Sequence, residues 1–301
     1  MILTYTATIE DNGKSILDIL IKKLALSRKL IIDLKRYDNG IMLNGERAYT
    51  NRILNINDLV IVNIPVTEDT ENVMSENIPI HILYEDDTLI ALDKPANMVV
   101  HPTHNYQSGT LANALAYYYE NTAAKLVIRP INRIDRGTTG IVMFAKNKYI
   151  HERFISHKSN LKFTKSYIAL IHGNFEPQAG TINLPIARVQ GSTIERCVSP
   201  DGQKCITHYE TLETFDDFSL VEFILETGRT HQIRVHCKYS GHPLVGDTLY
   251  FNDALKNNQG MDHQALHSHK ISFIHPVTLK NIEIVCKLPA DFLNAVNFLR
   301  T

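Results

Sequence analysis

Apolar residues in the first part of the sequence recur at the spacing of helices, followed by short strand-like runs. Ser15 precedes a helical apolar pattern that begins at Ile16, and Asp18 completes a capping box. Ser27 starts a second, shorter helical pattern. The run "IMLNG" (41–45) contains an Asn-Gly hairpin turn, and "DLVIVNIP" (58–65) gives another strand. Residues 1–65 are therefore expected to form a small α/β unit of two helices followed by a small sheet.

Beyond residue 78 the pattern changes to strands rich in β-branched and aromatic residues, with turn signals at their ends. Strands are expected at 78–86, 87–95, 139–147, 165–173, 205–215 and 218–228. Helical patterns fall at about 110–120, 147–160, 229–240 and 289–300. This mixture predicts an α+β fold with a large, mostly antiparallel mixed sheet flanked by helices.

Composition narrows the class of protein. The chain has 301 residues and 44% hydrophobic composition, enough for a large core, and no apolar run approaches the roughly 18 residues that cross a membrane. The amino terminus lacks the order of a secretory signal. Four cysteines without a Cys-x-x-Cys pair indicate buried thiols in a reducing compartment. We expect a cytoplasmic monomer with no membrane association.

Charge is unevenly distributed along the chain. The net charge is −1, but residues 14–36 hold seven Lys or Arg against two Asp, whereas residues 66–78 hold four acids and no base. The second stretch is typical of an acidic linker, and the first of a binding element for a polyanion. The candidate contacts are Lys22, Lys23, Arg28 and Lys29. An ordinary helix pair with solvated lysines remains the alternative.

One acidic side chain stands out by its neighbours. In "PINRIDRGTTG" (130–140), Asp135 lies between Arg133 and Arg136 at an expected tight turn between strands. A surface turn needs no such arrangement. The carboxylate is therefore either fixed in an ion pair or a working acid held ionised.

Two further segments offer candidate partners. In "LETGRTHQIRVH" (225–236), Arg229 falls in the first turn of an expected helix, where the helix dipole disfavours cations. An anionic partner would explain its place, and we predict that Arg229 reaches Asp135; a surface arginine is the alternative. Tyr167 lies within an otherwise apolar strand, where either core packing or catalysis would place a tyrosine.

Histidines are concentrated near the carboxyl end. His263 and His267 are four residues apart, a spacing that suits a metal on a helix, and His269 and His275 follow. However, "KISFIHP" (270–276) has the character of a strand. We therefore expect these histidines to make structural hydrogen bonds, and we predict no metal site.

Taken together, the motifs resemble those of the RluA/RluD-type pseudouridine synthases. The resemblance rests on "NRIDRGTTGIVMFAKN", "KSYIALIHG" and "LETGRTHQIRVHCKYSGHPLVGDTLY", with "YEDDTLIALDKPANMVVHP" before them and "HQALHSHKISFIHP" after them. It covers about residues 80–295. Residues 1–65 are similar to a small RNA-binding domain first known from a ribosomal protein of the small subunit. The expected organisation is an RNA-binding domain (1–65), a linker (66–78) and a catalytic domain (79–301).

The resemblance implies an enzyme that detaches uracil from its ribose, rotates it and rejoins it through carbon, without a metal or organic cofactor. Asp135 takes the place of the catalytic aspartate, Arg229 that of the arginine paired with it, and Tyr167 that of the aromatic residue packed against the base. Arg133 matches the arginine that enters the RNA stack when the target nucleotide is extruded. Asn132 stands where the family usually has histidine. With Arg133 it belongs to an implied substrate-binding set that also includes Arg136 and Ile233.

The implied partner is structured RNA, either ribosomal RNA of the large subunit or transfer RNA, with the basic helix pair on its phosphates. A non-catalytic RNA-binding or ribosome-assembly protein on the same fold is the main alternative, and the complete set of Asp135, Tyr167 and Arg229 argues against it. A glycosidase would need a second carboxylate opposite Asp135, and none lies near it in sequence.

Overall fold

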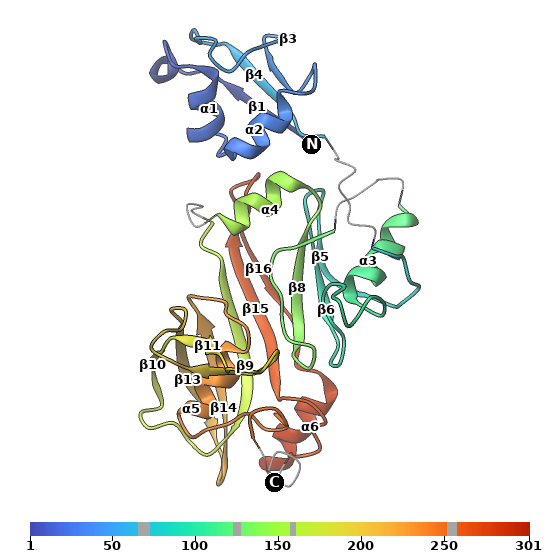
Figure 1. Cartoon of the computed structure of the whole chain (residues 1–301), viewed down its shortest axis with the longest axis vertical. Helices are drawn as coiled ribbons and strands as arrows, with labels where there is room; N and C mark the ends of the chain where they lie inside the picture. The colour runs from blue at the N-terminus through green and yellow to red at the C-terminus, as the bar shows by residue number, and fades with distance from the viewer. Residues whose placement is uncertain (66–72, 123–127, 157–160, 252–257) are drawn as a thin grey trace.

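The computed structural model describes residues 1–65, 73–122, 128–156, 161–251 and 258–301. The first 65 residues build a small four-stranded antiparallel sheet in the order β1-β4-β2-β3, with two short helices beside it (Figure 1). Its elements are β1 (Ile2–Thr6), the 3₁₀ turn η1 (Ile9–Asp11), α1 (Ile16–Lys22), α2 (Arg28–Leu34), β2 (Ile41–Leu43), β3 (Glu46–Arg47) and β4 (Leu59–Asn63).

Both predicted helix starts are confirmed. Ser15 and Asp18 form a capping box at α1, and the Ser27 hydroxyl accepts a hydrogen bond from the Leu30 backbone N–H at α2. Strand β1 was not predicted from the sequence. It is short, and it pairs with β4 at the opposite end of the unit, so no pattern in the neighbouring sequence predicts it.

The rest of the chain is organised around a ten-stranded sheet. Its main path is β10-β13-β14-β9-β15-β8-β6-β5, with β16 added to β15 and β7 to β8. All neighbours are antiparallel except β15 and β8. The predicted α+β fold with a mostly antiparallel mixed sheet is confirmed. The strands are β5 (His81–Glu85), β6 (Leu89–Lys94), β7 (Arg129–Pro130), β8 (Thr139–Ala145), β9 (Thr164–His172), β10 (Ala179–Asn183), β13 (Ile206–Thr214), β14 (Phe218–Leu225), β15 (Leu266–Ile274) and β16 (Asn281–Val285).

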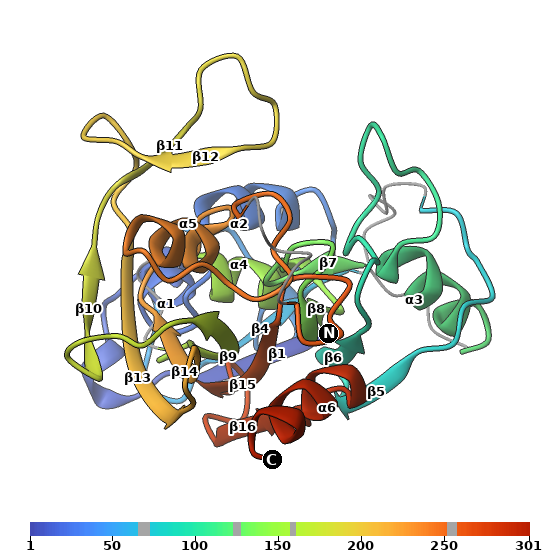
Figure 2. The ribbon, with the colours of Figure 1, turned by 90° about the horizontal axis from the view of Figure 1, so that it is seen from below.

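Helices flank this sheet, and a separate hairpin projects from it (Figures 1 and 2). The hairpin pairs β11 (Ile186–Arg188) with β12 (Arg196–Val198). The helices are α3 (Leu111–Glu120), α4 (Lys148–Ile155), α5 (Gln232–Tyr239) and α6 (Ala290–Leu299). The helix expected from residue 229 begins only at Gln232, because His231 is in the left-handed conformation and forms the N-cap.

Strand β8 shows why the sheet needs cover on both sides. All seven of its residues are buried. Ile141 and Met143 belong to the apolar cluster that includes residues of α4, whereas Val142 and Phe144 pack with residues of α3. Because side chains alternate across a strand, a run of apolar residues without polar interruption requires both faces to be covered.

The small sheet unit packs against α4 (Figure 1). The Tyr149 hydroxyl donates a hydrogen bond to the Leu24 carbonyl at 3.0 Å, and Lys148 forms an ion pair with Asp33. A single apolar cluster contains residues from both units. The boundaries expected at residues 65 and 79 stay a prediction, since 66–72 lie outside the described residues. None of the helices in the described part of the chain has the length and apolar character needed to span a bilayer.

Burial of His267 gives stability a defined dependence on pH. Thr139 Oγ1 lies 2.8 Å from His267 Nδ1, and His267 Nε2 lies 3.3 Å from the Cys286 carbonyl, so a neutral ring satisfies both partners. Burial lowers the pKa of His267 from 6.5 to about 4. Between these values the unfolded chain binds a proton that the folded chain does not, so stability is lost as pH falls.

We therefore expect His267→Gln to flatten the pH dependence of the free energy of unfolding between pH 6.5 and 4. The contribution removed should be roughly 3 kcal/mol, since each pKa unit corresponds to about 1.4 kcal/mol. Denaturant titrations at several pH values measure it. Equal slopes in the variant and the parent protein would contradict the assignment.

Candidate active site

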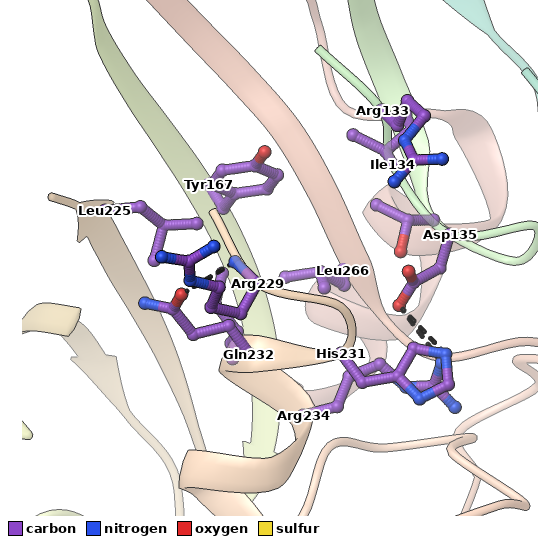
Figure 3. A pocket seen from close by; sticks show the side chains of 12 residues that line it. Arg133, Ile134, Asp135, Tyr167, Leu225, Arg229, His231, Gln232, Arg234 and Leu266 are labelled. Carbon is purple, nitrogen blue, oxygen red and sulfur yellow. Dashed lines mark hydrogen bonds and ion pairs between the residues drawn. The ribbon is translucent and has the colours of Figure 1, made fainter. Parts of the chain in front are cut away.

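A pocket opens where the turn between β7 and β8 meets strand β9 and the start of α5 (Figure 3). It combines a carboxylate, several cations and an apolar wall, contributed by segments far apart in sequence. The lining residues are Arg133, Ile134, Asp135, Thr138, Tyr167, Leu225, Arg229, His231, Gln232, Ile233, Arg234 and Leu266.

Asp135 is held at the pocket by its own turn and by α5. The Thr138 backbone N–H donates to the Asp135 carbonyl at 3.0 Å, closing a tight turn. The Asp135 side chain is 23% exposed, and its Oδ2 accepts a hydrogen bond from Arg234 Nη1 at 3.1 Å. Hydrogen bonds between ionised partners are stronger than neutral ones. One carboxylate oxygen is thus fixed while the group still faces the pocket.

Arg234 is shared between two carboxylates. Its Nε and Nη2 donate to Asp247 at 2.7 and 2.8 Å, while Nη1 reaches Asp135. Burial opposes the charge of Arg234, but the hydrogen bonds and charges of Asp247 and then Asp135 outweigh it and raise the pKa of the guanidinium. Asp247 is fully buried with both oxygens occupied, so it cannot be a second working carboxylate opposite Asp135.

His231 lies beside the same carboxylate. Its Nε2 is 3.9 Å from Asp135 Oδ2, and its Nδ1 is 2.7 Å from the Tyr250 hydroxyl. The Arg196 backbone N–H donates to the same hydroxyl at 3.0 Å, so Tyr250 links His231 to the β11–β12 hairpin. Burial lowers the pKa of His231, which leaves the ring neutral at pH 7.

Tyr167 forms the opposite wall of the pocket (Figure 3). It lies on β9 between Phe223 of β14 and Ser268 of β15, and only 6% of it is exposed. Burial, and then the negative charge of Asp135, raise the pKa of its phenol. At neutral pH the hydroxyl therefore keeps its proton. Apolar Leu225, Ile233 and Leu266 continue this wall, which suits a flat, weakly polar ring.

The ion pair predicted between Asp135 and Arg229 is made by Arg234 instead. Among the described residues, the ion pair of Asp135 is with Arg234, and the neutral His231 ring lies 3.9 Å from the same oxygen. Arg229 precedes α5, is exposed, and lies on the Leu225 side of the pocket (Figure 3). The physical reason is the late start of the helix. Residues 229–231 turn the chain before it coils, so Arg234, in the first turn, faces Asp135.

The remaining expected substrate residues occupy different places. Arg133 is exposed at the pocket and Ile233 lies in its wall. Asn132 does not line the pocket: its amide donates to the Ile141 carbonyl at 3.0 Å and accepts from the Met143 N–H at 2.8 Å. Its amide thus serves to hold the turn to β8 rather than to contact a ligand.

Arg136 also lies outside the pocket lining. Its Nε donates to the Asn97 carbonyl at 3.2 Å, and its guanidinium carbon lies 5.6 Å from the centre of the Tyr106 ring. The side chain therefore leans away from Asp135, toward the loop that follows β6. The alternation of arginine and aspartate in the motif does not reveal these different directions.

Sequence reasoning missed Arg234, His231 and Asp247. Arg234 is in the quoted motif. When the helix is predicted to begin at residue 229, however, Arg229 and not Arg234 falls in its first turn. Asp247 follows "PLVG", and an acid after an apolar run and a glycine is the available signal that it is buried. His231 had no local signal in the sequence, and its left-handed backbone conformation (φ 58°) is seen only in the structure.

The four basic residues predicted to contact RNA cluster around the connection between α1 and α2. Lys22 ends α1, Lys23 is its C-cap, and Arg28 and Lys29 begin α2. All four are exposed. Lys22 also forms an ion pair with Asp18 at 2.9 Å.

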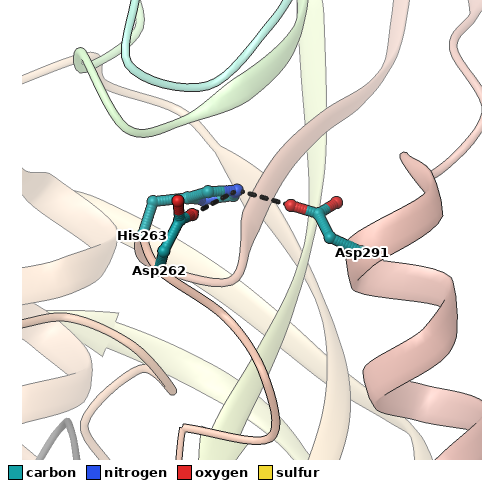
Figure 4. A group of neighbouring side chains, drawn as sticks. All are labelled: Asp262, His263 and Asp291. Atoms are coloured by element: carbon teal, nitrogen blue, oxygen red, sulfur yellow. Dashed lines mark hydrogen bonds and ion pairs between the residues drawn. The ribbon is translucent and has the colours of Figure 1, made fainter.

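His267 and His269 both bond to the Cys286 carbonyl, whereas His263 and His275 contact Asp291 and Asp86. Within the described ranges, the group with metal-ligand potential is Asp262, His263 and Asp291, whose ligand atoms lie within 4.8 Å of one another (Figure 4). His263 Nδ1 is 3.0 Å from the Gln264 carbonyl, and Nε2 is 2.9 Å from Asp291 Oδ2. These two contacts account for the ring without an ion.

The chain is similar to known proteins over most of its length. A family model described as RNA pseudouridylate synthase matches residues 88–239. The uncharacterized RNA pseudouridine synthase YjbO of Bacillus subtilis is 38% identical over 269 residues, covering 89% of this chain and 94% of that protein. Ribosomal large subunit pseudouridine synthase D of Haemophilus ducreyi is 37% identical, covering 75% and 72%. The solved structure of human RNA Pseudouridylate Synthase Domain Containing 4 shares the fold, with TM-score 0.59, 23% identity and coverage of 73% and 92%.

The two arginines make a matched pair for a stability test. Arg234→Gln leaves the buried Asp247 without its partner and should lower the free energy of unfolding by about 3–5 kcal/mol. Arg229→Gln, at an exposed position, should change it by no more than about 0.5 kcal/mol. Chemical denaturation measures both. Similar effects in the two variants would argue against Arg234 as the shared cation.

Proposed function

This chain belongs to the RNA pseudouridylate synthase family, and from that premise we propose that it converts specific uridines in the ribosomal RNA of the large subunit to pseudouridine. The resemblance found in the sequence is thereby confirmed: the protein is an RNA pseudouridine synthase, an isomerase. The choice of ribosomal RNA is supported by the 37% identity between this chain and ribosomal large subunit pseudouridine synthase D of Haemophilus ducreyi. The observation that carries the chemistry is Asp135, held by Arg234 at a pocket walled by Tyr167.

Asp135 is proposed to act at the ribose, as nucleophile or as base. In the overall reaction the bond between ribose C1′ and uracil N1 breaks, the base rotates, and a bond forms between C1′ and C5. The proton on C5 is released and N1 takes one up, so atoms and charge balance. Arg234 fixes one carboxylate oxygen, which leaves the other for the substrate. Holding the reacting group in one orientation is a large part of such catalysis.

Tyr167 and its apolar neighbours are proposed to hold the detached base. A uracil ring released from its sugar must rotate without leaving, and a wall of Tyr167, Ile233 and Leu266 offers flat, weakly polar contact. The phenol keeps its proton because burial raises its pKa. Tyr167 can therefore donate a hydrogen bond to the base but does not serve as a phenolate base.

The target nucleotide must leave its stack to reach Asp135. Extrusion of a base costs a few kcal/mol, and a side chain that fills the vacated space offsets part of this cost. Arg133 is exposed at the pocket, two residues before Asp135, and we assign this role to it.

The small sheet unit would hold RNA phosphates through its exposed basic cluster. We place the protein in the cytoplasm as a monomer.

Substitution Asp135→Asn should abolish the reaction while the protein stays folded. The test is pseudouridine mapping of total RNA from cells without this gene, complemented with the parent protein or with Asp135→Asn. We expect one or more sites in large-subunit RNA to vanish on deletion and to return only with the parent protein. If the variant restores them equally, Asp135 is not catalytic, and a lost site in transfer RNA would move the substrate there.

Replacing Lys22, Lys23, Arg28 and Lys29 together with Gln should weaken RNA binding and reduce its salt dependence. Each lost phosphate contact lowers the slope of log affinity against log salt by about 0.7 to 0.9, so four contacts account for roughly 3. Lys280→Gln with Lys287→Gln removes exposed charge at β16 as a control. Binding isotherms at several salt concentrations measure the slope, and an unchanged slope in the quadruple variant removes this role.

A further inference from the structure

The turn that carries Asp135 rests on a side chain that does not line the pocket. Gln264 is buried, with 7% of its surface exposed. Its Nε2 donates to Thr138 Oγ1 at 3.1 Å, and Thr138 is the residue whose N–H closes the turn onto Asp135. The amide of Gln264 thus contacts the turn without lining the pocket.

The end of the Gln264 side chain lies so close to the turn that a methyl group on Gly137 would displace it. A Cβ atom placed on Gly137 would lie 2.3 Å from Gln264 Oε1, and the three atoms nearest to that position all belong to Gln264. Gly137 is not among the glycines with positive φ, so its backbone could accommodate alanine. A methyl group at residue 137 would therefore move the glutamine amide away from the turn.

Gln264 itself is fixed by its own segment. The backbone N–H of Ala265 donates to the Val245 carbonyl at 2.8 Å, and the Ala265 carbonyl accepts from the Leu170 N–H at 3.1 Å. The preceding His263 is anchored to Asp291 at the start of α6 (Figure 4). Gln264 therefore projects from a backbone that is held on both sides.

The same segment also contacts the residue beside Asp247. Gly246, with φ +71°, lies so close to the His263 carbonyl that a Cβ there would be 2.3 Å from the oxygen. Asp247 follows directly and fixes Arg234. Residues 263–265 thus contact the turn that holds Asp135 on one side and the support of Arg234 on the other.

We propose that Gln264 is a positioning residue for the isomerisation. Its amide fixes the position of the turn that carries Asp135 relative to the Arg234 guanidinium. This inference rests on the proposed function of Asp135. The turn has a second support, since the buried Lys94 donates to the Arg136 carbonyl at 3.0 Å. Gln264 contacts the turn beyond that point, at Gly137 and Thr138, and so fixes the side of the turn that follows Asp135.

The functional consequence concerns the chemical step and not the binding of RNA. The side-chain amide of Gln264 bonds to Thr138 among the lining residues, its backbone carbonyl accepts from the Leu266 N–H at 2.7 Å, and the segment itself is buried. A displacement of the carboxylate by about 1 Å can lower a rate about 100-fold. Loss of Gln264 should therefore reduce kcat and leave KM for RNA nearly unchanged.

Four variants test this inference: Gln264→Ala, Gln264→Met, Gly137→Ala, and Gly137→Ala combined with Gln264→Ala. Met keeps the length of the side chain and removes the amide. We expect each single variant to lower kcat by about 10- to 100-fold, with KM within about twofold of the parent value. In the double variant the added methyl no longer meets an amide, so kcat should be no lower than in Gln264→Ala alone.

Several results would overturn the inference. These are a parental kcat in Gln264→Met, a loss expressed in KM alone, or strictly multiplicative effects of Gly137→Ala and Gln264→Ala. Thermal melting accompanies each assay. If Gln264→Ala does not fold, the kcat values of Gln264→Met and Gly137→Ala decide the inference. Both of these variants retain a large side chain at residue 264.

Assaying Asp135→Asn on the same RNA separates this inference from the proposed function. Activity that survives in Asp135→Asn would refute the role of Asp135 whatever Gln264 does. An inactive Asp135→Asn beside fully active Gln264 variants would refute only the positioning role.

Discussion

The candidate active site depends on one buried guanidinium shared by two carboxylates. Arg234 donates twice to Asp247 and once to Asp135, and its charge survives burial because both partners are anionic. Such a group is costly to bury unless its hydrogen bonds are satisfied. Asp247 satisfies most of them from inside the protein, so Arg234 stays in place before any substrate arrives. Asp135 can then be oriented by Arg234 and still face the pocket.

The fold can be understood as the scaffold that brings these three residues together. Asp135 lies on the turn before β8, Arg234 in the first turn of α5, and Asp247 in the segment that leads toward β15. Strands β8, β9 and β15 are neighbours in the sheet, with β15 in the middle. Their burial between helices makes the sheet rigid, and a rigid sheet keeps the turn and the helix start in register. The apolar wall around Tyr167 comes from β9, β14, β15 and the start of α5.

Binding and chemistry are assigned to different parts of the molecule. In the proposed reaction the pocket acts on one nucleotide, so the affinity for folded RNA would come from a wider surface. The small sheet unit provides exposed cations around the α1–α2 connection, and its packing on α4 holds it close to the large sheet. The net charge of the chain hides this division, because acidic residues elsewhere cancel the local excess.

Local features of this protein can be predicted from residues that are neighbours in the chain. They include the helix caps Ser15 and Ser27, the apolar patterns of the strands, and the residues of the motifs. The sequence also singled out Asp135 and Tyr167, because a carboxylate between arginines and a tyrosine in an apolar strand are visible within a few residues. It could not decide which arginine meets Asp135. Arg229 and Arg234 occupy the same motif, and the choice depends on where α5 begins. The tertiary structure selects Arg234 as the partner of Asp135. Asp247 and Asp135 lie 13 and 99 residues from Arg234 in the sequence, and folding brings the three together.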